Sequence, residues 1–132
     1  MTRHQSKFAA ADPTALAADY AEDGAMETRS AGPQQGRAQI TAYYQRWMQA
    51  FPGMAFKVEH VVAEENRAAV FFVVSGTHEG SFLGLAPTHK RIEFHGVMLL
   101  RFSDGLIAHQ RFVYDFGGLL IKLGVVKVKP GA

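Results

Sequence analysis

The stretch RIEFHGVMLLRFSDGLIAHQRFVYDFGG, residues 91–118, decides the fold of this chain. Residues 91–102 and 106–115 each read as a strand, because apolar and polar side chains alternate along much of their length. The Ser-Asp-Gly sequence between them, residues 103–105, is typical of a tight hairpin turn. We therefore predict an antiparallel pair of strands in the last third of the chain.

The first of these strands has two different faces. Phe94 and Met98 belong to a set of alternate side chains that is wholly apolar, whereas Val97 and Leu99 belong to a set with charged ends and an apolar middle. The first set suits the wall of a core or pocket. The second set suits a contact with another subunit, surrounded by a polar rim.

The second strand ends at Asp115, a carboxylate that follows a mostly apolar run. A carboxylate in such a place must be solvated, paired or used in chemistry. Two interpretations are open: Asp115 is a general base in a pocket, or it caps the turn into residues 117–123 by accepting backbone N–H bonds. Arg111 has the same strand parity, so it is a possible ion-pair partner that would keep Asp115 ionised.

The rest of the chain reads as helices followed by strands. The patterns predict helices from residue 12 to about residue 21 and over residues 37–50, and strands over residues 55–64 and 67–77. Helices first and antiparallel strands afterwards imply an α+β domain. The strand at 67–77 is apolar on both faces, so we expect it to be central and covered on both sides. Because a 14.5 kDa chain has too few helices for this, we predict a homodimer packed through the outer face of the sheet.

Composition narrows the classes of protein and partner. A length of 132 residues predicts a single domain over residues 1–132. A formal net charge of +2 gives no support for a nucleic-acid partner, and no apolar run reaches the ~20 residues of a membrane helix. The polar N-terminus does not resemble a secretory signal, and the chain has no cysteine, so we expect a cytoplasmic location.

Short motifs along nearly the whole chain carry a resemblance to a known family. They are DPTALAADYAED (12–23), GRAQI (36–40), AFPG (50–53), GTHEGSFLG (76–84), APTHKRIEF (86–94), RFSDGLI (101–107) and DFGGLLIKLG (115–124). Each motif is short, but their order is specific. Together they resemble the SnoaL-like polyketide cyclase group of the nuclear transport factor 2-like superfamily.

The resemblance implies a fold, a reaction and one catalytic residue. The fold is a cone in which a curved antiparallel sheet wraps around N-terminal helices, encloses a deep apolar cavity and generally dimerises through the sheet. Characterised cyclases of the group close a ring in a polyketide ester by an intramolecular aldol reaction, with neither a metal nor an organic cofactor. An aspartate near the end of the last strand acts as general acid/base, and the matching position here is Asp115.

Seven further residues are candidates for the wall of a pocket that holds an apolar small molecule. They are Tyr20, Trp47, His60, His78, Phe94, Met98 and Arg111. Four of them also have a plainer interpretation: Tyr20 and Trp47 as core, His60 as a satisfied core histidine, and His78 as a residue that hydrogen-bonds within its loop. Tyr20 is the phenol that we expect to reach the cavity as a hydrogen-bond donor.

Other classes of function remain open. A metal enzyme is not supported, because no histidines are paired as H-x-H or HExxH. A non-catalytic module that binds an apolar metabolite would explain the same apolar walls. An isomerase or hydrolase is a further alternative, because one fold can host many reactions.

Overall fold

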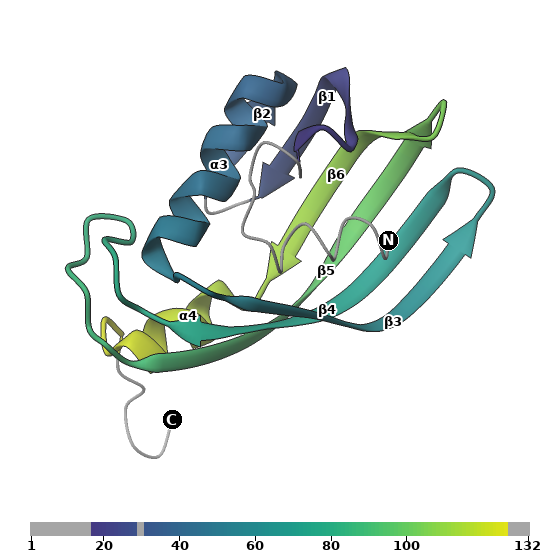
Figure 1. Ribbon diagram of the computed structural model, residues 1–132. Coiled ribbons are helices and arrows are strands. Elements are labelled where there is room, and N and C mark those ends of the chain that lie inside the picture. The colour runs from purple at the N-terminus through teal and green to yellow at the C-terminus, as the bar shows by residue number, and fades with distance from the viewer. Residues whose placement is uncertain (1–16, 29–30, 127–132) are drawn as a thin grey trace.

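A six-stranded sheet in the order β2-β1-β6-β5-β4-β3 forms the frame of the protein (Figure 1). The computed structural model describes residues 17–28 and 31–126. The elements are β1 (Tyr20–Thr28), β2 (Gly32–Gln35), α3 (Gly36–Ala50), β3 (Ala55–Glu64), β4 (Arg67–Thr77), β5 (Arg91–Ser103), β6 (Leu106–Tyr114) and α4 (Phe116–Leu123). This curved open sheet with its two helices confirms the predicted α+β fold.

The sheet is antiparallel at every junction except that between β1 and β6, which run parallel. The middle of the sheet is formed by β6 and β5, and β4 lies next to the edge strand β3. The strand at 67–77 is therefore an interior strand, paired on both sides as expected, although it does not lie in the middle of the sheet. Its apolar residues alternate between a buried inner row and an outer row that includes the exposed Phe71.

Helix α3 packs on the concave side of the sheet, beside β1 and β2 (Figure 1). It begins after Gln35, whose backbone N–H donates to the Gln39 side chain at 2.7 Å. Its buried face follows from apolar residues at three- and four-residue spacing and includes Tyr43 and Trp47. The Trp47 ring meets four aromatic rings at centroid distances of 5.2–5.8 Å: those of Phe51, Phe82, Phe94 and Tyr114.

Residues 20–28 form a strand where the sequence pattern predicts the end of a helix. The parallel partner of this strand is β6, more than eighty residues away in sequence, with Tyr20 opposite Ile107 and Ala25 opposite His109. A bulge separates these two pairs, and a Cβ on Gly24 would lie within 2.9–3.0 Å of two backbone oxygens there. Pairing across the sheet thus outweighs the local helical spacing. The remainder of that expected helix, residues 12–16, lies outside the described residues.

Both helices of the described part of the chain are short, with 15 residues in α3 and 8 in α4. Neither has the length and apolar composition needed to cross a membrane.

Candidate functional site

The space between α3 and the sheet is almost completely filled by side chains. A hollow of about 20 Å³ remains there, which is room for about one water molecule. Its walls are Tyr43, Tyr44, Trp47, Met54, Phe56, Val74, Phe94, Met98, Gln110 and Phe112. The expected deep cavity inside the cone is therefore closed by its own aromatic walls.

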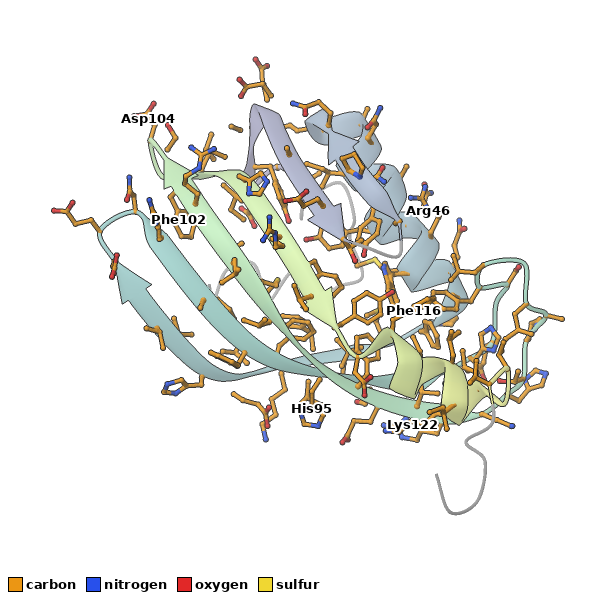
Figure 2. All side chains as sticks on the ribbon, turned by 180° about the vertical axis from the view of Figure 1, so that it is seen from behind. Arg46, His95, Phe102, Asp104, Phe116 and Lys122 are labelled. Carbon is orange, nitrogen blue, oxygen red and sulfur yellow. The ribbon has the colours of Figure 1, made fainter. Side chains whose placement is uncertain are left out.

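A much larger hollow, of about 600 Å³, lies where β6 continues past the end of β1. Its lining residues are Glu27, Thr28, Arg111, Phe112, Val113, Tyr114 and Phe116. Figure 2 shows Phe116 pointing from the start of α4 toward the side chains between the sheet and α3. A hollow of this size with aromatic walls and a few polar groups is typical of a site for an organic molecule. We call it the outer hollow.

A third hollow, of about 50 Å³, borders on the other two, and we call it the loop hollow. Its lining residues are Ala31, Tyr43, Arg46, Trp47, Phe82, Leu83 and Tyr114. It shares Tyr43 and Trp47 with the interior hollow and Tyr114 with the outer hollow. The three hollows are therefore neighbours that share aromatic lining residues.

Asp115 is exposed and forms the N-cap of α4. Its Oδ1 accepts a hydrogen bond from the Gly118 backbone N–H at 2.9 Å. The position follows from strand parity, because Arg111 and Val113 are also exposed side chains of β6. The capping interpretation is confirmed, and the expectation that Asp115 faces a dry pocket was wrong. Its catalytic role stays a prediction. Asp115 lies next to the outer hollow in the chain, because its two neighbours Tyr114 and Phe116 line that hollow.

Arg111 pairs with Glu27 and not with Asp115. The two residues are register partners on β6 and β1, and Arg111 Nε lies 3.3 Å from Glu27 Oε1. His109 Nε2 approaches the same oxygen at 3.4 Å. The structure thus places Arg111 in the wall of the outer hollow, with its charge shared with a carboxylate.

Tyr20 is fully buried and belongs to a hydrogen-bonded group behind the interior hollow. Its hydroxyl donates to Gln110 Oε1 and lies 2.7 Å from the Tyr44 hydroxyl. Burial is the main cause that raises the pKa of Tyr20 and of Tyr44 above the ordinary tyrosine value. Because its hydroxyl is already bonded, Tyr20 is not the phenol that faces open space.

Trp47, Phe94 and Met98 come together in the wall of the interior hollow, as the sequence predicts. His60 does not join them. A bulge between Val58 and His60 shifts the strand, so that His60 stands opposite the outward-facing Phe71 and is exposed. The expectation that His60 points inward was therefore wrong, because a bulge reverses the parity of every residue beyond it.

His78 is buried and holds the loop before β5. Its Nδ1 lies 2.9 Å from Thr88 Oγ1 and accepts from the Thr88 backbone N–H at 3.1 Å, so the neutral ring carries its hydrogen on Nε2. Burial lowers the pKa of this imidazole. The His78 ring contacts the Phe51 ring in a tilted arrangement, with centroids 5.5 Å apart, and lines none of the three hollows. The structure thus agrees with the interpretation that His78 hydrogen-bonds within its loop.

Several residues that line the hollows were not predicted from the sequence as pocket residues: Tyr43, Gln110, Phe112 and Tyr114. Alternation along residues 106–115 already places Gln110, Phe112 and Tyr114 on one face. The neighbouring Tyr43 and Tyr44 share the buried face of α3, and nothing in their spacing shows which hydroxyl is bonded. Within residues 17–28 and 31–126, no cluster of three or more His, Asp or Glu side chains is arranged to hold a metal ion.

Comparisons with known proteins assign the chain to a family. The model of the SnoaL-like polyketide cyclase family matches residues 1–123. The chain is 30% identical over 109 residues to the aklanonic acid methyl ester cyclase AcmA of Streptomyces galilaeus, covering 80% of this chain and 72% of that protein. It is 35% identical over 80 residues to the nogalonic acid methyl ester cyclase of Streptomyces nogalater, covering 59% of this chain and only 60% of that relative.

The fold agrees with this assignment. The crystal structure of AclR from Streptomyces galilaeus superposes with a TM-score of 0.85 at 26% identity, covering 98% of this chain and 85% of that one. The chain therefore belongs to the SnoaL-like polyketide cyclase family and has its nuclear transport factor 2-like fold.

Proposed function

We propose that this protein closes a ring in a polyketide methyl ester by an intramolecular aldol reaction, without a metal or an organic cofactor. The observation that carries the proposal is the outer hollow of about 600 Å³, with Asp115 next to two of its lining residues. Aromatic walls of this kind favour a flat, largely apolar substrate. The two curated relatives, named as cyclases of nogalonic and aklanonic acid methyl esters, support this class of substrate.

In this proposal Asp115 acts as base and then as acid. The carboxylate removes a proton from a carbon that lies between two carbonyl groups of the substrate. The resulting enolate carbon attacks a carbonyl carbon of the same molecule, and the new C–C bond leaves an alkoxide, which takes the proton back from Asp115. The hydrogen bond from Gly118 uses Oδ1, so we assign the transfer to Oδ2. A positioned acid/base of this kind contributes about 10²–10⁴-fold in rate.

The direct test is ring closure of aklanonic acid methyl ester and of nogalonic acid methyl ester by the purified protein. We expect the substrate to be converted to a product of the same mass, separated by chromatography, faster than in buffer alone. The variant His60→Asn is a suitable control, because His60 is exposed and lines none of the three hollows, and it should retain full activity. Rates equal to those in buffer for both esters would reject this substrate class.

A binding module without turnover is the second candidate. It is favoured by one observation, the exposed position of Asp115 and its use as a helix cap. A binding module would take up the same esters and release them unchanged.

We also propose that the protein forms a homodimer through the outer face of its sheet. In the middle of this face, Phe71, Val97 and Val113 stand side by side on three strands, and Leu99 lies in the next row. Phe71 is 43% exposed and Leu99 is 44% exposed. Polar residues border the apolar middle, among them His95, which points away from α3 in Figure 2. A second copy of the chain would bury this face against its own equivalent.

Replacing Val97 and Leu99 together with glutamate is expected to produce a monomer. Two added carboxylates on each subunit would have to lose their water in the contact, which costs several kcal/mol. Sizing chromatography with light scattering measures the outcome. Leu83→Glu is the matched control, because Leu83 is 65% exposed but lies in the loop before β5, away from this face. If the double variant and the control both run as dimers, another surface forms the dimer.

We further propose a single domain over residues 1–132 in the cytoplasm. The length of 132 residues supports the first of these expectations, and the absence of cysteine supports the second.

A further inference from the structure

In the described part of the chain, the hydroxyl of Tyr43 is buried and no group accepts its hydrogen. The side chain is only 4% exposed and lies on the buried face of α3. Burial raises the pKa of this phenol, and the neighbouring Trp47 indole opposes the rise. Because an indole N–H can only donate, Trp47 cannot accept the phenolic hydrogen. A buried donor left unused costs stability, so it requires an explanation.

The location of Tyr43 offers one. Its side chain lines both the interior hollow and the loop hollow. Tyr114 lines both the loop hollow and the outer hollow, and its side chain is only half-buried. A ligand that fills the outer hollow and moves the Tyr114 ring aside would reach the Tyr43 hydroxyl.

The surroundings define the chemistry of such a ligand. Around Tyr43 the walls are mainly aromatic and aliphatic, and the polar groups of the interior hollow, on Tyr44 and Gln110, are already bonded to Tyr20. A charged group would lose its water there without a partner of opposite charge. A neutral carbonyl oxygen, in contrast, needs one donor, and Tyr43 supplies it.

We propose that Tyr43 donates its phenolic hydrogen to a neutral carbonyl oxygen of a planar ligand that extends from the outer hollow past Tyr114. The inference rests on the proposed cyclase function and adds the group that holds the carbonyl oxygen of the substrate. In the aldol reaction this donor would face the oxygen on which enolate charge develops, and donors in that position stabilise the transition state.

Binding of 9-fluorenone and fluorene tests the proposal, because the two planar molecules differ by one carbonyl group. Titration calorimetry should show that the wild-type protein prefers fluorenone, and that Tyr43→Phe lowers its affinity for fluorenone about tenfold while leaving that for fluorene unchanged. The carbonyl stretching band of bound fluorenone should lie at lower frequency in the wild-type protein than in Tyr43→Phe. The matched control is Tyr44→Phe, which removes a hydroxyl already bonded to Tyr20 and should keep the preference for fluorenone.

Three results would overturn the proposal: no fluorenone binding to the wild-type protein, unchanged binding by Tyr43→Phe, or an equal loss in Tyr44→Phe. Thermal melting guards against misfolding, because removal of an unbonded hydroxyl should leave the Tm of Tyr43→Phe unchanged or higher, whereas Tyr44→Phe should lower it. Failure of this inference is distinguishable from failure of the cyclase function. Ring closure with normal rates in Tyr43→Phe rejects only the role of Tyr43, and Tyr43-dependent fluorenone binding without ring closure rejects only the cyclase.

Discussion

Replacing Asp115 with asparagine is expected to slow ring closure by about 10²–10⁴-fold while the protein stays folded. Asparagine caps a helix as well as aspartate does, so the hydrogen bond from Gly118 and the start of α4 should both persist. An amide cannot take up the substrate proton, so the chemistry alone is removed. Turnover of a methyl ester substrate and the melting temperature of the variant, measured side by side, provide the check.

The alanine variant separates the two roles of Asp115. Asp115→Ala removes both the base and the cap, so it should lose activity like Asp115→Asn and also about 1 kcal/mol of unfolding free energy. If Asp115→Asn instead turns over substrate at the wild-type rate, the carboxylate is a cap and no more. The binding module would then be the better description if no other base were found.

The second large effect is expected at Gly80, in the loop between β4 and β5. A Cβ at this position would lie 1.9 Å from the Gln49 carbonyl oxygen and 3.2 Å from Ala50 Cα, both at the end of α3. The Gly80 and Glu79 backbone N–H groups also donate to the Ala50 carbonyl, at 3.1 and 3.0 Å. Because the obstacle is backbone, Gly80→Ala should push the loop off the helix and lower the unfolding free energy by about 3 kcal/mol.

Chemical denaturation measures this loss. Gly117→Ala is the control, because a Cβ at Gly117 meets nothing within 4 Å and the residue lies inside α4. Alanine there should leave stability unchanged or raise it by up to about 1 kcal/mol. A Gly80→Ala variant as stable as the wild type would mean that the loop does not pack against the end of α3 as described.

Two strands and one helix could be predicted from the sequence almost to the residue. The predicted strands at 55–64 and 67–77 coincide with β3 and β4, and the helix predicted at 37–50 is α3 at Gly36–Ala50. These elements could be predicted because the pattern of apolar side chains within each segment is enough to indicate a strand or a helix. Residues 20–28 have no signal of this strength, since their strand depends on pairing with β6 and with β2.

The site was less predictable because it depends on a bulge in a strand and on contacts between residues that are far apart in the sequence. The bulge before His60 turns that side chain outward, and no residue type in the stretch announces it. Asp115 points outward like Arg111, because both have the same parity on the strand. This orientation could be predicted from the sequence, but the resemblance to the family favoured an inward-facing Asp115. Tyr43 and Tyr44 differ in whether the hydroxyl has a neighbour to bond with: that of Tyr44 bonds to Tyr20, and that of Tyr43 finds no acceptor. This difference depends on the packing of distant segments and cannot be predicted from the spacing of the two residues.

The central place of Trp47 gives this protein a built-in optical reporter. It is the chain's single tryptophan, and its indole sits among Phe82, Phe94 and Tyr114 while bordering two of the hollows. Its ultraviolet emission therefore comes from one defined position. Unfolding of the aromatic core and arrival of a guest beside α3 can both be followed at that position, with no dye or engineered label attached.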